Sequence, residues 1–183
     1  MLKNTVEYKR FVWELNNFID INKSIIFVCI GTSSIIGDSF GPVVGSILKN
    51  TLKNNSAKVI GDLQNCVTYT DIHRKMNNIK KQYSNSLIIV VDSALASKAN
   101  IGKVFVQNRG LKYAESLKKS NDIIGNISIK AVVGENSNNN LRNFYNLRDV
   151  SLQRIKNVSA IAANGIIEVM NKKENNGKNI YKW

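Results

Sequence analysis

The chain has 183 residues, 43% hydrophobic and 21% charged, which suits one compact domain with a hydrophobic core. Its formal net charge of +13, from 26 Lys and Arg against 13 Asp and Glu, at first suggests a polyanionic partner such as nucleic acid. The basic residues are 20 Lys and only 6 Arg, accompanied by 27 Asn, 23 Ile and a single Pro, a bias typical of A+T-rich coding DNA. We therefore attribute much of the charge to genome composition and do not expect a nucleic-acid partner.

The lengths of the apolar runs and the N-terminal sequence argue against a membrane or secreted protein. The longest apolar runs, Ile25–Ile30 and Leu87–Val91, are far shorter than the roughly 20 residues of a membrane-spanning helix. No signal-peptide pattern opens the chain, so we expect a cytoplasmic protein without a membrane partner. Two cysteines, Cys29 and Cys66, are too few for a disulfide scaffold or a thiolate metal site, and Cys29 is expected to be a buried hydrophobic residue.

Apolar residues recur at helical or strand spacing along most of the chain. In chain order, the spacing predicts an amphipathic helix within residues 1–20, a strand at Ser24–Ile30, a helix from Phe40, a strand at Ala57–Ile60, a polar helix at Thr70–Tyr83, strands at Ser86–Val91, Lys103–Gln107 and Ile127–Val133, a polar loop at Asn136–Asn140, a helix from Asp149 and a flexible tail over 171–183. This alternation predicts a single α/β domain over 1–183, a three-layer α/β/α sandwich with a mainly parallel sheet.

The most informative segment runs from Gly31 to Pro42, between a buried strand and a helix. Such a segment lies at the carboxyl edge of a parallel sheet, where α/β proteins place their sites. Gly31 lets the chain leave the strand sharply, Gly37 permits a positive φ, and Asp38 or Ser39 can cap the helix. Neither a phosphate loop nor a dinucleotide-binding fingerprint fits, because no Gly-Lys-Ser/Thr follows and the glycine spacing is wrong.

The helix after this segment begins with residues that suit close packing. Pro42 fits the first turn, where a missing amide hydrogen costs nothing. Gly41 and Gly45 are one turn apart and have no side chains. We therefore expect this helix to approach the sheet closely.

A second acidic residue, Asp92, directly follows the apolar strand that ends at Val91. Because the carboxyl ends of parallel strands share one edge, Asp38 and Asp92 are expected to converge on one crevice. Two close carboxylates can share a proton and activate water, or bind a divalent cation. Each aspartate alone could equally be a capping residue, so the pair is what indicates a site. No cofactor is expected; if a divalent metal is present, Asp38, Asp62 and Asp92 are the candidate ligands.

Other polar residues point less clearly to chemistry. His73 is the only histidine, so a Ser–His or Cys–His nucleophile system has no spare base, and we expect His73 to be exposed on a polar helix. Arg142, Arg148 and Arg154 are six residues apart, which scatters them around a helix and does not make a nucleic-acid stripe.

Over residues 24–168 the order and spacing of these motifs resemble the YyaC-type spore proteases, relatives of the germination protease and of the hydrogenase maturation proteases. The resemblance lies in Val28–Thr32, Gly37–Pro42 and Val90–Leu95. It implies a phosphorylase/hydrolase-like three-layer fold, and it implies that Asp38 and Asp92 are the catalytic pair. Beside them, we expect Gly31, Thr32, Gly37 and Ser93 to bind substrate.

The resemblance also carries expectations about metal and about one loop. In hydrogenase maturation proteases the Asp38 position holds an acidic nickel ligand, and Asp62 falls near a second. Close YyaC-type sequences have histidines around the positions of Thr68 and Ser128, whose loss here argues against nickel. They also have a Pro-Gly-Ala-Gly turn where this chain has Lys112–Ser116.

The resemblance, together with the pair of aspartates, thus implies a peptidase of the forespore or spore interior that acts on a protein or peptide during sporulation or germination. We expect Asp92 to be the more buried partner with a raised pKa, and Asp38, at a helix N-terminus, to stay ionised and activate water. One alternative is an inactive binding or assembly protein on the same fold, its crevice reshaped by Tyr113–Ser116. Another is a basic nucleic-acid-associated spore protein, which predicts Lys clustered on one face.

Overall fold

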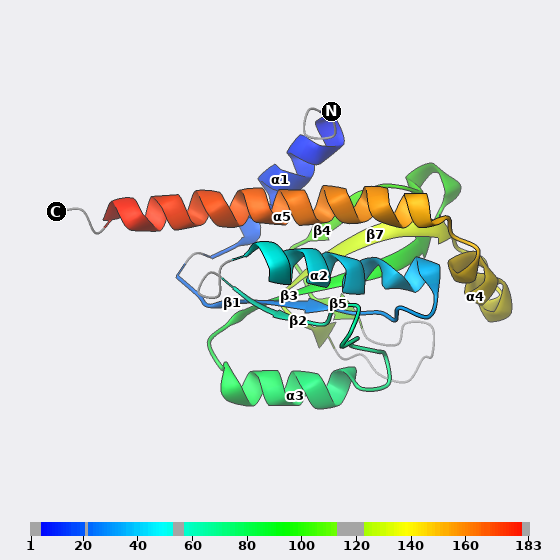
Figure 1. Ribbon diagram of the computed structural model, residues 1–183, viewed down its shortest axis with the longest axis horizontal. Helices are drawn as coiled ribbons and strands as arrows, with labels where there is room; N and C mark the ends of the chain where they lie inside the picture. Colours follow the sequence, from blue (N-terminus) through cyan, green and yellow to red (C-terminus); the bar gives the residue numbers. More distant parts are fainter. Residues whose placement is uncertain (1–4, 21, 53–56, 113–122, 181–183) are drawn as a thin grey trace.

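The computed structural model describes residues 5–20, 22–52, 57–112 and 123–180 (Figure 1). Its centre is a five-stranded sheet in the order β2-β1-β3-β7-β4. The neighbours pair in parallel except β4, which runs antiparallel to β7. A separate ribbon pairs two short antiparallel strands, β5 and β6. The strands are β1 (Ile25–Cys29), β2 (Lys58–Ile60), β3 (Leu87–Ala96), β4 (Val104–Gln107), β5 (Leu111–Lys112), β6 (Ile123–Ile124) and β7 (Ile127–Glu135).

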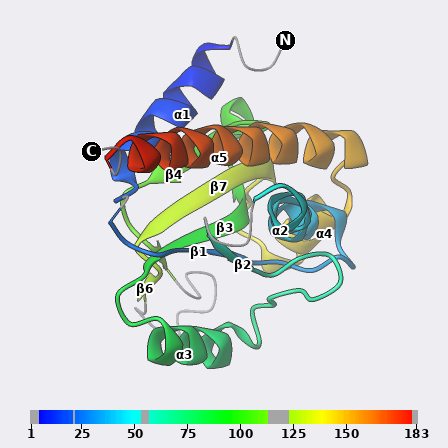
Figure 2. The same cartoon turned by 60° about the vertical axis from the view of Figure 1, so that its left-hand side comes forward.

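Helices cover both faces of this sheet (Figures 1 and 2). On one face lie α1 (Val6–Phe18), α2 (Phe40–Thr51) and α5 (Leu152–Ile180), and on the other lies α3 (Ile72–Gln82). The short helix α4 (Asn140–Arg148) packs against β7 and against η2 (Ile36–Ser39), a one-turn 3-10 helix that leads into α2. A second such turn, η3 (Lys98–Asn100), follows β3. The predicted α/β fold with a mainly parallel sheet between helical layers is confirmed.

The two central strands are buried on both faces because their sequences are continuously apolar. All five residues of β1 and the first five of β3 are buried. Along β3, Ile89 and Val91 pack beneath α1, α2 and α5, whereas Ile88 and Val90 pack toward α3. Each aliphatic side chain buried in this way stabilises the fold by about 1.5–3 kcal/mol. The helix-on-both-faces architecture follows from this two-sided burial.

The second half of β3 departs from prediction. The sequence predicts that this strand ends before Asp92, but it continues to Ala96. The reason is its neighbour β7, which extends to Glu135 and pairs with β3 beyond the end of β1. Asp92 therefore lies in the part of β3 that pairs with β7 but no longer with β1, just beyond the end of β1.

The C-terminal third of the chain contains more helix than the sequence predicts. The polar loop expected at Asn136–Asn140 ends at Asn139, whose side chain accepts a hydrogen bond from the Arg142 amide at 3.1 Å and caps α4. Helix α5 continues to Ile180, where a flexible tail is predicted from Asn171, and residues 181–183 lie outside the described residues. None of the helices in the described ranges combines the length and apolar character needed to cross a membrane.

Two glycines allow α2 to lie directly on the sheet and its loops, as predicted. A Cβ at Gly41 would come 2.0 Å from the carbonyl oxygen of Ile30. A Cβ at Gly45 would come 1.9 Å from the carbonyl oxygen of Gly61. These atoms belong to backbone, which cannot move aside as a flexible side chain could. The position of α2, and of the η2 turn before it, therefore depends on the absence of side chains at 41 and 45.

We predict that Gly45→Ala destabilises the protein by more than about 2 kcal/mol, because the methyl group must push α2 away from the sheet. Urea unfolding followed by circular dichroism measures the change. The matched control is Asn50→Ala, an exposed position on the same helix, where helix propensity favours alanine. Equal stabilities of Gly45→Ala and Asn50→Ala would contradict the close packing.

Candidate functional site

A cleft of about 560 Å³ opens at the carboxyl ends of β1 and β3. One side is formed by the loop after β1, by η2 and by α4, and the other by the β5–β6 ribbon and the segment that leads into α3. The second half of β3 runs between them. The lining residues are Ile30, Gly31, Asp38, Tyr69, Ile72, Asp92, Ser93, Ala94, Leu95, Leu111, Lys112, Ile124, Asn136, Asn140, Asn143, Phe144 and Leu147.

Asp38, in η2, is held in the cleft by the loop after β1 and by β3. The Thr32 backbone N–H donates to Asp38 Oδ2 at 2.9 Å, and Ser93 Oγ donates to Oδ1 at 3.4 Å. Gly31 has a φ of 138° and a Cβ there would meet the Asp38 carbonyl oxygen at 2.0 Å, so only glycine lets the loop close on η2. Burial raises the pKa of Asp38 to about 6, a value that already includes the partial offset by the Thr32 and Ser93 hydrogen bonds.

Two predictions for this segment are wrong, namely a side-chain cap on α2 from Asp38 or Ser39 and a positive φ at Gly37. Ser39 is the N-cap of α2 but makes no side-chain cap bond, and its hydroxyl donates to the Ile36 carbonyl oxygen at 2.7 Å. Asp38 is turned back to the loop because η2 intervenes before α2 begins. Gly37 has no positive φ and does not line the cleft; it is buried under α4, where a Cβ would come 2.4 Å from the Leu147 carbonyl oxygen.

Asp92 lies one residue beyond the last β1–β3 pair, Cys29 with Val91. It is half-buried and lines the same cleft as Asp38. Burial, and after it the negative charge of Asp38, raise the pKa of Asp92 to about 7, against the opposing effects of Lys130 and the Ser93 backbone N–H. Asp92 thus has the higher pKa of the two, as predicted, whereas the pKa of Asp38 is raised by burial instead of being held low by a helix N-terminus. Asp38 and Asp92 are called the aspartate pair below.

Asp62 does not line the cleft that holds the aspartate pair, although the sequence proposes it as a third carboxylate. Its side chain forms an ion pair with Lys49 Nζ, and it accepts the amides of Gln64 at 2.8 Å and Asn65 at 2.6 Å. These hydrogen bonds, led by that from Lys49, lower the pKa of Asp62 against the effect of burial. Its bonds hold the turn after β2, which is a structural role.

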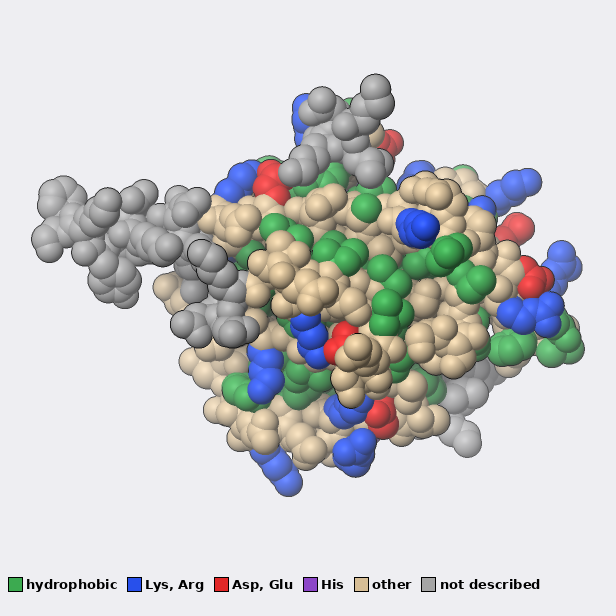
Figure 3. All heavy atoms as spheres, in the orientation of Figure 1, with side chains coloured by type: hydrophobic (Ala, Val, Ile, Leu, Met, Phe, Trp, Pro, Cys, Tyr) green, Lys and Arg blue, Asp and Glu red, His purple; other side chains and the backbone are tan. Residues whose placement is uncertain are grey.

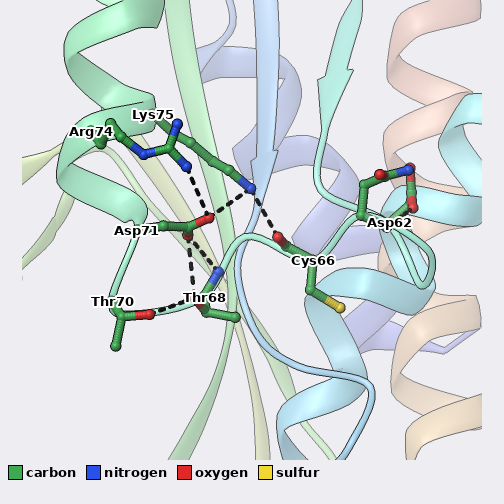
Figure 4. Close-up of polar contacts among 8 residues, drawn as sticks. Asp62, Cys66, Thr68, Thr70, Asp71, Arg74 and Lys75 are labelled. Carbon is green, nitrogen blue, oxygen red and sulfur yellow. Dashed lines mark hydrogen bonds and ion pairs between the residues drawn. The ribbon is translucent and has the colours of Figure 1, made fainter.

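A polar network then fixes the segment from this turn to α3 (Figure 4). Asp71 Oδ1 accepts the Thr68 amide at 2.9 Å. Lys75 Nζ lies 2.9 Å from Asp71 Oδ2 and donates to the Cys66 carbonyl oxygen at 2.9 Å. The network holds both ends of the segment that places Tyr69 on the wall of the cleft.

The side chains of the cleft do not fit a nickel site of the kind the resemblance implies. In the described ranges no three His, Cys, Asp or Glu side chains gather in a metal-binding group. His73 is exposed on α3, as predicted, and is not part of the cleft lining. Nickel favours imidazole and thiolate ligands, whereas this cleft offers two carboxylates. A hard divalent cation on the aspartate pair stays a prediction.

Sequence interpretation missed the two apolar walls of the cleft. Phe144 and Leu147 come from α4, and Leu111 and Ile124 come from the ribbon. The α4 wall had a usable signal, since Leu141, Phe144 and Leu147 recur at three-residue spacing. The ribbon strands have two residues each, too few for a periodic pattern. The Tyr113–Ser116 loop between them lies outside the described residues.

The fold is of the kind seen in hydrogenase maturation proteases. It is similar to the NiFe hydrogenase maturation protease HycI from Thermococcus kodakarensis KOD1, with a TM-score of 0.57 and 16% identity, covering 86% of this chain and 99% of that one. It is also similar to peptidyl-tRNA hydrolase from Acinetobacter baumannii, with a TM-score of 0.52 and 12% identity, covering 85% and 96%. Identities this low describe the fold alone.

By sequence, the chain belongs to the family described as "Protein of unknown function (DUF1256)", whose model matches residues 1–165. It is 28% identical over 144 residues to the uncharacterized protein YyaC of Bacillus subtilis (strain 168), covering 79% of this chain and 68% of that protein. The resemblance to YyaC-type sequences and to the fold of the maturation proteases is therefore confirmed. A protease role in the spore belongs to the proposal below.

The raised pKa values make a prediction about stability. The folded state keeps a proton on Asp92 up to about pH 7, whereas an unfolded chain loses it near its ordinary value of 3.8. The folded state therefore binds more protons between these values, and the free energy of unfolding falls as the pH rises through this range. Asp38 acts in the same direction up to about pH 6. At pH 8 the burial of two charged carboxylates is most costly.

We predict that Asp92→Asn raises the free energy of unfolding at pH 8 by about 1–3 kcal/mol, after allowance for partial exposure. The gain should disappear toward pH 4. Thermal unfolding of both proteins across this pH range measures it. Asp149→Asn, at a side chain 63% exposed, is the control and should keep the wild-type pH dependence. An identical pH dependence in wild type and Asp92→Asn would refute the proposed burial cost.

Proposed function

We propose that this protein is a peptidase that uses Asp38 and Asp92 as its acid–base pair. The observation that carries the proposal is the placement of two carboxylates from separate elements in one cleft, with pKa values raised to about 6 and about 7. Such values suit proton transfer near neutral pH. The motifs at Gly37–Pro42 and Val90–Leu95, which resemble those of the germination protease, support a protein or peptide substrate of the forespore or spore interior, met during sporulation or germination.

The chemistry requires one proton on the aspartate pair. Asp38, oriented by the Thr32 amide and the Ser93 hydroxyl, is the lower-pKa partner and accepts a proton from water as the water oxygen bonds to the peptide carbonyl carbon. Asp92 donates its proton to the amide nitrogen as the carbon–nitrogen bond breaks. The products are a carboxylic acid and an amine. Transfer of the proton from Asp38 to Asp92 then restores the starting state.

We predict that Asp38→Asn and Asp92→Asn each lower kcat/KM at least about 100-fold, because each removes one proton-transfer group. The assay follows new termini by mass spectrometry in a peptide library prepared from dormant bacterial spores. Asp149→Asn, at an exposed side chain that is not part of the cleft lining, should cleave as wild type does. Wild-type rates in both pair variants would refute the proposed roles of Asp38 and Asp92.

The pH dependence of cleavage gives a separate prediction. Below about pH 6 Asp38 becomes protonated and the base is lost, and above about pH 7 Asp92 ionises and the acid is lost. The profile of kcat/KM in the free enzyme should therefore be bell-shaped, with its maximum between these values. Initial rates measured with one cleaved peptide at constant ionic strength test this. A rate that rises steadily through pH 8 would contradict a protonated Asp92 as the acid.

An assembly role has one observation in its favour, the exposed apolar side of α4. Leu141, Phe144 and Tyr145 are 63%, 46% and 42% exposed beside the cleft. A wild-type protein that binds peptides but never cleaves them would favour this alternative. The nucleic-acid alternative gains no support from the face that carries α2 and α5, where Figure 3 shows Lys and Arg spread apart and mixed with acidic and polar side chains.

A further inference from the structure

Strand β3 has one paired edge and one open edge beyond Val91. β1 pairs with Leu87–Val91 and then turns away, whereas β7 stays beside β3 as far as Ala96. In the ranges that the structure describes, no strand pairs with the second half of β3 on the side where β1 lay. This half of β3, from Asp92 to Leu95, lines the cleft.

The alternation of backbone groups shows which of them face the open edge. The Val91 carbonyl oxygen accepts the Ile30 amide at 2.8 Å on the β1 side. The Ala96 carbonyl oxygen accepts an amide just after β7, also at 2.8 Å, on the other side. Because backbone groups alternate along a strand, those of Ser93 and Leu95 are directed to the β1 side. The Ser93 N–H lies close enough to the Asp92 carboxylate to lower its pKa, so we assign the Ser93 carbonyl and both backbone groups of Leu95 to the open edge.

The cleft offers two apolar walls on either side of this edge. One is formed by Phe144 and Leu147 of α4, and the opposite one by Ile72, Leu111 and Ile124. Among the described residues of the lining, the charged ones are the aspartate pair and Lys112. An extended peptide beside β3 would direct its side chains alternately to these two walls.

We propose that the cleft binds its substrate as an extended peptide strand added to the open edge of β3 at Ser93 and Leu95, with uncharged, mainly apolar side chains on the walls. Main-chain hydrogen bonds then supply affinity, and the walls supply specificity for alternate residues. The added strand passes beside Ser93, whose hydroxyl is bonded to Asp38, so a peptide bond lies beside the aspartate pair. This inference rests on the proposed function for the identity of its ligand.

The test uses an acetylated, amidated heptapeptide of alternating valine and threonine and the Asp92→Asn variant, which lacks the proposed acid. N-methylation of the peptide, one amide at a time, should weaken binding about tenfold or more at alternate positions and little at those between. In the complex the Leu95 amide should exchange its hydrogen at least about tenfold more slowly, while the amides of Ala94 and Ala96, which face β7, should not change. Equal effects at all peptide positions, an unprotected Leu95 amide or no binding at millimolar peptide overturns the proposal.

A pair of protein variants gives an independent readout. Leu95→Pro removes the edge donor without removing a β7 hydrogen bond, and Leu95→Ala keeps the donor while shortening the side chain. Binding should fall about tenfold or more in the proline variant relative to the alanine variant. Equal binding by two folded variants overturns the proposal. If N-methylation weakens binding at alternate peptide positions but the wild-type protein never cleaves a peptide, the peptidase proposal is refuted and strand addition is supported. If the wild-type protein cleaves peptides but N-methylation shows no alternation, strand addition is refuted and the peptidase proposal is supported.

Discussion

The in-register parallel pairing of β1 with β3, from Ile25 with Leu87 to Cys29 with Val91, decides where the groups of the cleft lie. It brings the ends of two chain segments, more than sixty residues apart in sequence, to one edge of the sheet. The loop after β1 can then reach Asp38 with its Thr32 amide, while Asp92 projects from β3 one residue past the pairing. A slip of one residue would turn Asp92 to the other face of the sheet, so the same contacts that build the core also fix the aspartate pair.

Local burial prevails over the overall charge of the protein in setting the chemistry of the cleft. A net charge of +13 favours ionised carboxylates everywhere on the surface, yet the pKa values of Asp38 and Asp92 are raised. Salt screens charges more than roughly 10 Å apart, whereas loss of water acts directly on the group that is buried. Asp62 shows the opposite balance, because a direct ion pair with Lys49 and two amides outweigh its burial.

The convergence of Asp38 and Asp92 could be predicted because continuous apolar runs identify buried parallel strands, and a residue after such a strand lies at a known edge. A single sequence could not show in which direction each side chain points or which groups it contacts. Asp38 fails to cap α2 because η2 intervenes, a turn of four residues without a periodic pattern. β3 passes beyond Asp92 because a partner distant in sequence is long enough to hold it. Asp62 also follows a predicted strand, but the ion pair with Lys49 and the amides of Gln64 and Asn65 give it a structural role that the strand pattern does not indicate.

The close contact of α2 with backbone at Gly41 and Gly45 also bears on how relatives of this protein should be compared. A relative without catalytic activity would still need both glycines to fold, because a side chain at either position would collide with a backbone carbonyl oxygen. Glycines at these positions in a distant homologue therefore indicate only that the fold is the same. The two aspartates are not needed for folding and can be replaced in a homologue that is no longer selected for activity. Under the proposed function, Asp38 and not Gly41 is the residue of the Gly31–Pro42 segment that distinguishes active members of the family from inactive ones.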